Sequence, residues 1–459
     1  MGERENFGSK IGVVLAAAGS AVGLGNIWRF PIETGQNGGA AFIIVYIACI
    51  ILFGLPIMMS EFIIGRRTHT NTAGAYRTLA PGTQWKWVGR LGVFTGFMIL
   101  GYYSVVAGWT AEYSVLAAMN AFDGKGVADF PQIFSDFVSN PWKPIVWLVF
   151  FLLLTHIVIV RGVNSGIEKF SKVLMPMLFI IIVVLVVCSV MLPNASAGVE
   201  FLLKPDFTKI NGNVILRAMG QAFFSLSLGM GCLCTYASYF DRETNIAKTA
   251  LQVCIIDTFI ALMAGFIIFP AAFSAGYSIG PNDVGPSLIF ITLPNVFQEA
   301  FAGLPILSYV FSVMFYLLLV VAALTSTISM HEVATAYLSE EFSMSRQKAA
   351  TIITVCCTII GVFCSLSFGM LADWKIFGMS IFDFFDFTSS NILLPVGGMF
   401  ISLFAGWYLD KKLYRDELTN GGNLKAPYFK ALTFILKYVA PIAIGLILLN
   451  QVGVFALFD

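Results

Sequence analysis

Residues 16–31 read AAAGSAVGLGNIWRFP, an apolar stretch with Gly19, Gly23 and Gly25 in its middle and Arg29 near its end. A second apolar stretch, residues 223–240, reads FFSLSLGMGCLCTYASYF, with two glycines around one methionine. Each Gly in a helix interior costs about 1 kcal/mol relative to Ala. The two stretches therefore predict helices that unwind at their centres, although close helix packing through small residues would also explain the glycines.

The composition around these stretches is that of a membrane protein. Of 459 residues, 58% are hydrophobic and 12% are charged, whereas a soluble domain carries roughly 25% charged residues. This excludes a soluble globular enzyme, a disordered chain and a secreted disulfide scaffold. The 27 basic and 26 acidic residues nearly cancel, so nothing indicates a nucleic-acid partner. The chain is predicted to be an all-α polytopic membrane protein.

Cysteine, histidine and motif content argue against catalytic chemistry. The eight cysteines lie in apolar stretches without a Cys-x-x-Cys pair, and His69, His156 and His331 are far apart in sequence. Neither a metal cluster nor a disulfide framework is expected. No nucleophile elbow, zinc-protease or ATP-binding lysine motif occurs, so we expect neither an enzyme nor an ATP-driven pump. The opening MGERENFGSK is predicted to be retained, because no cleavage signal follows it.

A spanning helix needs about 20 mostly apolar residues, and eleven segments qualify. They are 11–35, 40–65, 88–118, 143–160, 166–192, 214–239, 246–274, 305–337, 347–370, 378–408 and 430–456. The Pro- and Gly-rich region 281–304 is predicted to be a loop with short helices. With the N-terminus in the cytoplasm, 20 of the 27 basic residues fall on the cytoplasmic side, as the positive-inside rule requires. An odd number of spans then places the C-terminus outside.

The two glycine-broken segments are the first and the sixth spans. This spacing predicts one transmembrane domain over 1–459, with a five-helix repeat at 11–192, an inverted copy at 214–408 and an eleventh helix at 430–456. Interrupted helices at corresponding places in two halves are a good pointer to a transporter's central site. The fifth span carries Gly166 and Pro176, which indicate either a fixed kink or a place that unwinds during opening.

Several motifs resemble those of the neurotransmitter:sodium symporter family, which has the LeuT fold. They are GSAVGLGNIWRFP (19–31), NGGAAF (37–42) with Glu61, Tyr102-Tyr103, GQAFFSLSLGMG (220–231), AALTSTIS (322–329) and the Gly166 to Pro176 spacing. They occur in the family's order from about residue 4 to 440. The eleven spans are similar to those of bacterial transporters of hydrophobic and aromatic amino acids in this family.

The resemblance implies two Na⁺ sites made of oxygen ligands. The first would comprise Ala21, Asn26, Ser225 and Asp257. The second would comprise Gly19, Val22, Ala322, Thr325 and Ser326. Asp257 stands where the family most often has Asn, and an ionisable group in mid-membrane is by default functional, although a neutral Asp in the core is the alternative. A Thr-Ser pair alone more often bonds its own helix backbone.

The chloride pattern of the family is only partly present. Tyr46, Gln221 and Ser225 match the residues of chloride-dependent relatives, but Asp257 and Ala261 stand where those have Asn and Ser. Chloride-independent relatives commonly have Glu at the position of Ala261, so this chain follows neither pattern. Because a carboxylate at Asp257 would repel an anion and supply its charge, we expect no chloride requirement.

The implied substrate is a zwitterionic α-amino acid. A half-helix N-terminus offers free N–H groups and a positive dipole end to a carboxylate. The groups for the carboxylate would be the amides of Leu24 and Gly25, the Tyr103 hydroxyl and the first Na⁺. The groups for the ammonium would be the carbonyls of Ala21, Phe224 and Ser225 and the Ser227 hydroxyl. Residues 20–23 lack the Asp of amine-transporting relatives, which disfavours a decarboxylated amine.

The implied side-chain pocket is largely apolar. It would be formed by Ile99, Tyr103, Phe224, Met230, Ser326 and Met330. This set favours an apolar or aromatic side chain, and the flexible Met side chains adapt to several shapes. Ordinary core filling would also explain each Met.

The resemblance also implies two gates. An Arg inside a span needs a partner, and Arg29 with Asp386 matches the family's external pair. On the cytoplasmic side Arg4 and Glu340 match the internal pair, with Tyr239 beside them, while Phe7 replaces the usual Trp. The expected function is Na⁺-coupled import of a hydrophobic or aromatic amino acid across a bacterial inner (plasma) membrane.

Alternative functions remain at this point. A proton-coupled amino-acid carrier of the same fold would use Asp257, although the complete second sodium set argues against it. A Na⁺ symporter for a small neutral amino acid such as Gly or Ala is a second alternative. A channel fits less well, because one closed site between two broken helices is typical of a carrier. A membrane enzyme fits less well, because no catalytic motif is present.

Overall fold

The computed structural model describes residues 6–277 and 287–451, and over these ranges the chain is helical without a β-strand. Within them nine helices are long and apolar enough to cross a membrane. Their helical elements are α3 (Ala40–Cys49), η2 (Ile50–Gly54) and α4 (Leu55–Thr68); α6 (Lys86–Ala118); α8 (Lys143–Val160); η3 (Val163–Glu168) and α9 (Lys169–Val190); α13 (Ile246–Ser274); α15 (Pro305–Glu341); α16 (Arg346–Leu366); α17 (Ile381–Phe387), η6 (Thr388–Leu393), α18 (Leu394–Leu403) and η7 (Phe404–Tyr408); and α20 (Phe429–Phe434), η8 (Ile435–Val439) and α21 (Ala440–Gln451). Each coincides with a predicted span.

The first predicted span is broken at its glycines. It consists of α1 (Lys10–Ala21), the π-helical η1 (Gly25–Arg29) and α2 (Phe30–Gln36), and the two halves meet at an angle of 54°. Counted as one span, this bent pair is the tenth. The break falls at residues 22–24, inside the quoted AAAGSAVGLGNIWRFP, as predicted.

The sixth predicted span, 214–239, is two short helices and not one continuous helix. α11 (Gly212–Ser225) and α12 (Cys232–Ala237) are separated by residues 226–231, so neither half is long enough to qualify as a span by itself. Gly229 and Gly231 have φ of 85° and 76°, a left-handed backbone that Gly adopts without a Cβ clash. Ser227 also has a positive φ, 54°, which is uncommon for a residue with a side chain.

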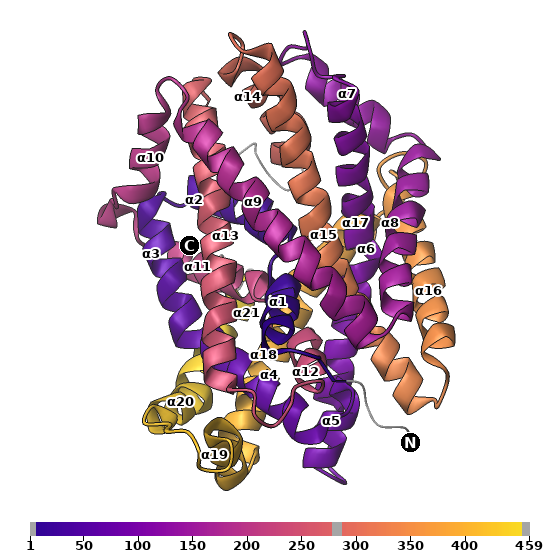
Figure 1. Cartoon of the computed structure of the whole chain (residues 1–459), viewed down its shortest axis with the longest axis vertical. Coiled ribbons are helices and arrows are strands. Elements are labelled where there is room, and N and C mark those ends of the chain that lie inside the picture. Colours follow the sequence, from indigo (N-terminus) through magenta and orange to yellow (C-terminus); the bar gives the residue numbers. More distant parts are fainter. Residues whose placement is uncertain (1–5, 278–286, 452–459) are drawn as a thin grey trace.

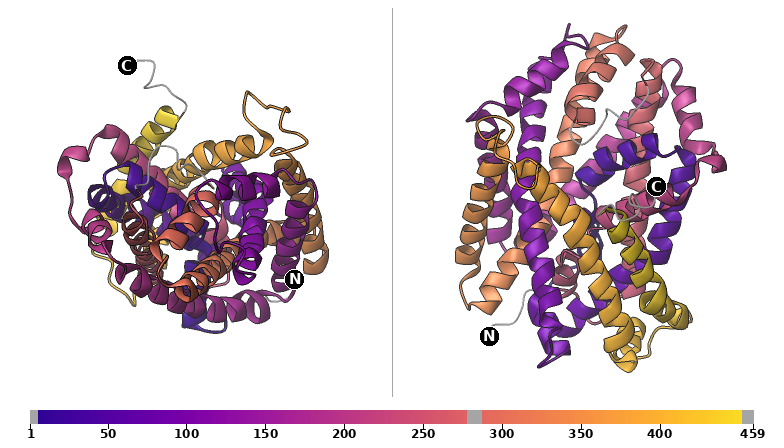
Figure 2. Two further views of the ribbon diagram at one scale, coloured as in Figure 1. Left: turned by 90° about the horizontal axis from the view of Figure 1, so that it is seen from above. Right: turned by 180° about the vertical axis from the view of Figure 1, so that it is seen from behind.

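Short helices cap the two ends of the bundle. They are α5 (Thr72–Leu79), α7 (Asp129–Val138), α10 (Ala195–Leu203), η4 (Phe207–Lys209), η5 (Leu288–Thr292), α14 (Leu293–Ala300) and α19 (Lys411–Thr419). α7 and α14 lie at one end and α5 and α19 at the other (Figures 1 and 2). The short helices predicted within 281–304 are η5 and α14; residues 281–286 lie outside the described ranges.

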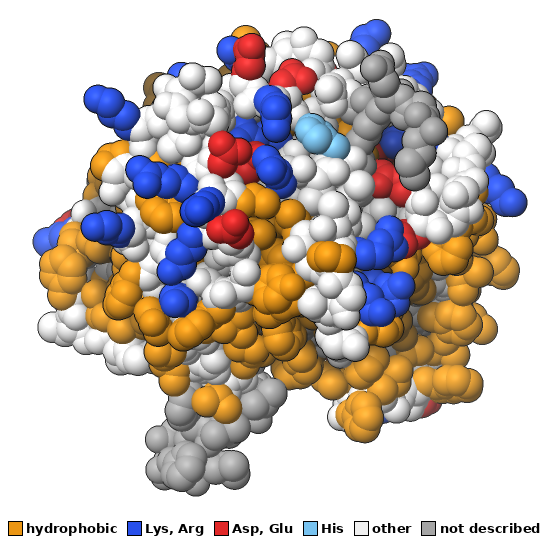
Figure 3. All heavy atoms as spheres, turned by 90° about the horizontal axis from the view of Figure 1, so that it is seen from below, with side chains coloured by type: hydrophobic (Ala, Val, Ile, Leu, Met, Phe, Trp, Pro, Cys, Tyr) orange, Lys and Arg blue, Asp and Glu red, His pale blue; other side chains and the backbone are white. Residues whose placement is uncertain are grey.

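The end formed by α5 and α19 is named the basic end below. Seen from that side, Lys and Arg side chains are spread over the face with a few acidic groups between them, and apolar side chains surround them (Figure 3). Such an arrangement is typical of the cytoplasmic surface of a membrane protein.

The broken helices lie inside the bundle. α6 packs along α15 and also contacts α8 and α16, while α1 packs against α9, α13 and α15. Gly166 in η3 lies so close to α8 that a Cβ on it would be 2.2 Å from the Val158 carbonyl oxygen, so this position excludes a side chain. Pro176 lies inside α9, which continues through it. This one conformation does not distinguish the two alternatives predicted for Gly166 and Pro176, a fixed kink and a segment that unwinds during opening, so both stay predictions.

Candidate functional site

A small cavity of about 30 Å³ lies between the two helix breaks. Ten of the eleven residues predicted for the substrate line it, and the eleventh, Leu24, is adjacent. The lining residues are Ser20, Ala21, Gly23, Gly25, Ile99, Tyr103, Phe224, Ser225, Ser227, Met230, Ser326 and Met330. Ser20 and Gly23 are additional to the prediction, although both lie in the quoted stretch. Ligand pockets for small molecules measure about 300–1,000 Å³, so the walls must separate to admit an amino acid.

Polar groups from three elements meet at this cavity. The Leu24 N–H donates to the Tyr103 hydroxyl over 3.1 Å, and the Ser227 hydroxyl donates to the Ser20 carbonyl over 3.0 Å. Both hydrogen bonds join the unwound part of one helix to another element. A donor-rich edge near Leu24 and an acceptor-rich edge near Ser20 suit the two ends of a zwitterion.

Asn26, Ser225 and Asp257 form the buried cluster predicted as the first sodium site. Asn26 Nδ2 donates to Asp257 Oδ1 over 2.7 Å and to Ser225 Oγ over 3.0 Å, and Ser225 Oγ lies 2.9 Å from Asp257 Oδ2. The Gly23 N–H donates to Asn26 Oδ1 over 2.9 Å. The cluster brings together four oxygens, from Asp257, Ser225 and Asn26, which are the ligand type that a hard cation prefers. Asn26 Nδ2 and the Gly23 N–H are the two nitrogens among the atoms in contact.

The same cluster bears on the anion question. Besides Ser225, the Tyr46 hydroxyl points at Asp257, with its oxygen 3.4 Å from Oδ2. Gln221 Nε2 donates to the Gly25 carbonyl over 3.3 Å, whereas its buried Oε1 has no hydrogen-bond partner among the described residues. Hydroxyls that would donate to a bound anion are therefore directed at a carboxylate of this chain.

The residues predicted for the second sodium site also converge. Thr325 Oγ1 and Ser326 Oγ donate to the Val22 carbonyl over 3.3 and 3.2 Å, which joins α15 to the break in the first span. Thr325 also bonds the Ala322 carbonyl of its own helix over 2.9 Å, so the local alternative accounts for part of its hydrogen bonding. A Cβ on Gly19 would lie 3.5 Å from Thr325 Cβ, which places all five predicted residues together.

Glu61 has a position that sequence motifs did not reveal. Its Oε1 accepts from the Gly229 N–H over 2.9 Å and its Oε2 accepts from the Cys234 N–H over 3.4 Å. Glu61 is 1% exposed. Its buried carboxylate accepts hydrogen bonds from backbone N–H groups at the unwound segment, which would otherwise lack a partner inside the membrane. The sequence analysis named Glu61 only as part of a family motif. The fold shows that its carboxylate joins the N–H groups of Gly229 and Cys234 at the break between α11 and α12.

The predicted external gate is not an ion pair in this structure. The Arg29 guanidinium lies 4.5 Å from the centroid of the Phe224 ring, and Asp386 accepts from Ser390 Oγ over 3.1 Å. Tyr102 also contacts Ser390, with 3.3 Å between the hydroxyl oxygens. Within residues 6–277 and 287–451, Arg29 has no acidic group within ion-pair distance. The pairing of Arg29 with Asp386 stays a prediction for another conformation.

The predicted internal gate is partly described. Arg4 lies outside the described residues, and Glu340 accepts from the backbone and side-chain N–H groups of Asn71 over 2.7 and 3.0 Å. Tyr239 donates to Glu332 Oε1 over 2.6 Å, and Arg346 binds both oxygens of that carboxylate over 2.9 and 2.5 Å. The Tyr239–Glu332–Arg346 network was not predicted, because nothing in the sequence aligns these three positions.

An aromatic contact and an ion pair also lie near the basic end. Phe7 packs edge-on against Tyr236 and Tyr239 with ring centroids 6.0 Å apart. Arg77 pairs with Glu341 over 2.6 Å, and these hydrogen bonds raise the pKa of the Arg77 guanidinium. Among the described side chains no group of three His, Cys, Asp or Glu could hold a metal ion.

Comparisons with known proteins agree over nearly the whole chain. The family model described as the sodium:neurotransmitter symporter family matches residues 4–123 and 131–457. An uncharacterized sodium-dependent transporter of Bacillus subtilis (strain 168) is 39% identical over 98% of both chains, and one of Haemophilus influenzae is 35% identical over 98% of both. The crystal structure of MhsT in complex with L-phenylalanine matches with a TM-score of 0.88 at 40% identity, covering 98% of this chain and 100% of that one.

Proposed function

The chain belongs to the sodium:neurotransmitter symporter family, and we propose that it imports an apolar or aromatic α-amino acid together with Na⁺. It is a transporter and not an enzyme, and the match to MhsT confirms the predicted LeuT fold. What the proposal adds is the substrate class, the residues that bind it, the number of ions and the absence of a chloride requirement.

The observation that carries the proposal is the cavity between the two helix breaks. Its polar edge consists of backbone groups and the hydroxyls of Tyr103 and Ser227, while Ile99, Met230 and Met330 supply apolar walls. Backbone N–H groups at a helix end bind a carboxylate without a cationic side chain. A zwitterion with an apolar side chain matches both surfaces, and the relative MhsT was crystallised with L-phenylalanine.

The proposed coupling to two Na⁺ ions is supported by two clusters of oxygen-bearing groups. The first, around Asn26 and Asp257, borders the substrate cavity through Ser225, so an ion there would contribute directly to the substrate carboxylate site. The second lies where Thr325 and Ser326 meet the Val22 carbonyl. An ion in that place would hold α15 against the first helix break, and its departure would release that contact.

Chloride independence rests on Asp257. Hydrogen bonds from Ser225 and Tyr46 already satisfy its buried carboxylate, and a second anion a few ångströms away would be repelled. Some relatives are named for a chloride requirement; one is the mouse sodium- and chloride-dependent GABA transporter 2, which is 27% identical over 91% of this chain. In this chain the fixed negative charge of Asp257 beside the Na⁺ sites would take the place of that chloride ion.

We place the basic end in the cytoplasm and propose alternating access. At that end the bidentate Arg346–Glu332 pair, the Tyr239 hydroxyl and the Phe7 side chain seal the path from the cavity. At the other end Arg29 covers the cavity through Phe224. Substrate and ions would enter past Arg29, and the two broken helices would then rock against the scaffold and open the basic end.

The rival is a proton-coupled carrier of the same fold, in which Asp257 would carry the proton. Equilibrium binding to the purified protein separates the two. We expect saturable binding of labelled Phe, Leu and Trp in sodium gluconate, little binding in potassium gluconate at equal ionic strength, and weak binding of Gly. Equal binding in both salts would favour the proton-coupled carrier, and tight binding of Gly alone would move the substrate class to small amino acids.

A pair of tyrosines on α6 provides matched variants for this assay. Tyr103→Phe removes the hydroxyl that we assign to the substrate carboxylate, whereas Tyr113→Phe removes a buried hydroxyl that donates to the Phe290 carbonyl over 3.0 Å. A hydrogen bond to a charged group contributes about 1.5–3 kcal/mol, so Tyr103→Phe is expected to weaken Phe binding at least ten-fold. Tyr113→Phe is expected to bind as the wild type does; equal effects would reject the assignment.

A further inference from the structure

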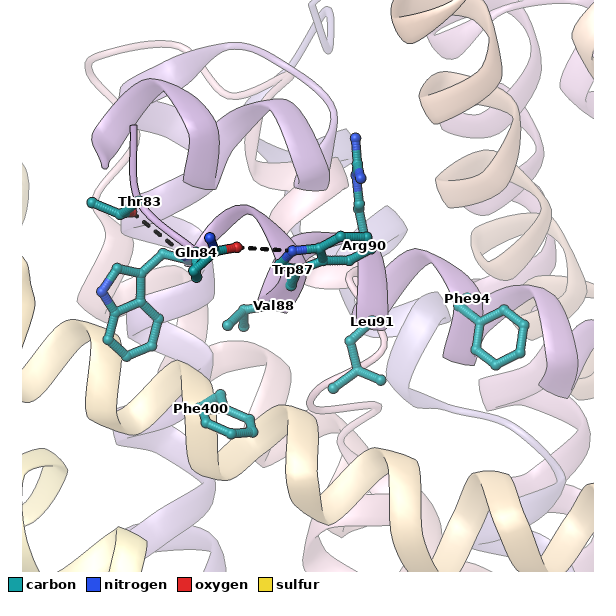
Figure 4. Close-up of a pocket in the computed structure, with 9 residues that line it drawn as sticks. Thr83, Gln84, Trp87, Val88, Arg90, Leu91, Phe94 and Phe400 are labelled. Atoms are coloured by element: carbon teal, nitrogen blue, oxygen red, sulfur yellow. Dashed lines mark hydrogen bonds between the residues drawn. The ribbon is translucent and has the colours of Figure 1, made fainter. Parts of the chain in front are cut away.

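The surface of α6 near the basic end carries an open apolar groove (Figure 4). It has a volume of about 780 Å³ and runs between the first turns of α6 and the last turns of α18, where Phe400 lies. Its apolar lining includes Trp87, Val88, Leu91, Phe94 and Phe400. Trp87 and Phe94 are 55% and 52% exposed, so both rings are accessible from outside the bundle.

A second apolar groove lies on the other side of the same helix. It has a volume of about 380 Å³ and is bounded by α6, α15 and α16. Its lining includes Val93, Phe97, Ile352, Ile353 and Cys356. Arg90 and Phe94 line both grooves, so the two form one saddle-shaped surface across α6 with a single cation at its edge.

Arg90 is available to a ligand of opposite charge. Its guanidinium lies 4.7 Å from the Trp87 ring centroid, and no ion pair joins it to any residue within the described ranges. Its acidic neighbour Glu341 is held by Arg77 through two hydrogen bonds of 2.6 and 2.8 Å. In Figure 4 Arg90 extends away from the side chains of Leu91 and Phe400, so charged and apolar parts of the surface point in opposite directions.

We propose that this saddle binds one anionic glycerophospholipid, with its phosphate on Arg90 and one acyl chain in each groove. Two grooves that share one cation match two chains that share one headgroup. Trp87 provides the amphipathic ring that is enriched at the membrane–water interface, and anionic lipids attract basic groups at the cytoplasmic surface. The proposal goes beyond transport and requires only that the basic end lies at the membrane–water interface.

A lipid fits this surface better than a protein segment does. Apart from Arg90, Thr83 and Gln84, the grooves are lined by aliphatic and aromatic side chains and one Cys, among which only the Trp85, Trp87 and Tyr337 side chains carry an N–H or O–H group. A peptide backbone in this apolar belt would leave most of its polar groups unsatisfied. Because acyl chains gain little by leaving other acyl chains, selection must come from the headgroup. The expected signature is therefore a preference by charge at equal chain length.

Native mass spectrometry of the purified transporter tests the proposal. Phosphatidylglycerol and phosphatidylcholine with identical chains are titrated separately, and the first bound lipid is followed. We expect the wild type to retain phosphatidylglycerol at about five-fold lower concentration, the effect of one basic side chain near an anionic surface. Arg90→Gln is expected to abolish this preference, and Arg415→Gln, an exposed basic residue of α19 outside both grooves, is expected to keep it.

Three results of the titration would overturn the proposal: a wild type without preference, an Arg90→Gln variant that keeps the preference, or equal loss of preference in Arg90→Gln and Arg415→Gln. A measurement without substitutions guards against a variant that fails to fold. In a structure determined in phosphatidylglycerol nanodiscs, lipid phosphate is expected within hydrogen-bond distance of the Arg90 guanidinium, with a chain on each side of Phe94. Ordered lipid elsewhere and none on this saddle would equally reject it.

Discussion

Replacing Asp257 with Asn removes one negative charge from the candidate first sodium site and leaves its shape almost unchanged. The Asn carbonyl oxygen can still accept from Asn26 Nδ2, now 2.7 Å from Asp257 Oδ1. The new amide N–H can donate to the Tyr46 hydroxyl, whose oxygen lies 3.4 Å from Oδ2. The hydrogen bond that Ser225 Oγ donates to Oδ2 over 2.9 Å is lost, although Ser225 can still donate to the retained oxygen, which lies 3.1 Å away. The change in ion binding is therefore expected to report mainly the lost charge.

The size of the effect follows from the burial of Asp257, which is 0% exposed. Two unit charges 4 Å apart attract by about 4 kcal/mol at an effective dielectric constant of about 20. The carbonyl dipole of Asn recovers part of this energy. We expect Na⁺ binding to weaken by about 2 kcal/mol, which is roughly a thirty-fold rise in the half-saturating Na⁺ concentration.

The assay is a Na⁺ titration of labelled Phe binding in chloride-free buffer, with Asp416→Asn as the control. Asp416 has a side chain 50% exposed beside Arg67, so its neutralisation is expected to leave the titration unchanged. Adding chloride to Asp257→Asn is expected to recover part of the Na⁺ affinity, because Ser225 and Tyr46 become free to donate to an anion. An Asp257→Asn titration that matches the wild type would refute the claim that this carboxylate supplies the charge.

Three further outcomes are expected. Ser326→Ala, which loses a hydroxyl 3.2 Å from the Val22 carbonyl, should raise the half-saturating Na⁺ concentration roughly ten-fold with the thermal unfolding temperature retained; an unchanged titration counts against the second sodium site. Gly229→Ala places a side chain at a φ of 85°, with the new Cβ only 2.6 Å from the Leu394 carbonyl oxygen. Thermal unfolding in detergent should therefore show that the free energy of unfolding falls by about 2 kcal/mol or more. In the control Gly303→Ala no atom lies within 4 Å of the new Cβ, so this variant should unfold at the wild-type temperature. Replacing chloride with gluconate should leave wild-type Phe binding unchanged, and a fall in binding would reject chloride independence.

Local sequence signals accounted for the helices and for the positions of their breaks. Apolar length and positive charge at the span ends are local properties, and so is a pair of glycines in a membrane segment. They predicted the break at residues 22–24 and the one at 226–231. The predicted span 246–274 also coincides with α13, whose first turn is capped by the Asn245 side chain.

What the sequence did not reveal depends on contacts between distant segments. Glu61 crosses the second break only because α4 packs against α12. Glu332 and Arg346 are 14 residues apart, outside the three- and four-residue spacing at which helix positions are neighbours, so neither suggested the other. The predicted pairing of Arg29 with Asp386 requires a conformation in which Arg29 leaves the Phe224 ring, and conformation is not a property of sequence patterns.

The most direct test of Na⁺-coupled import is uptake of labelled Phe into proteoliposomes under imposed gradients. An inward Na⁺ gradient with equal pH on both sides is expected to drive Phe above its external concentration, and an inward proton gradient without Na⁺ is expected to drive none. Accumulation under the proton gradient alone, or equal uptake with K⁺ in place of Na⁺, would contradict the account.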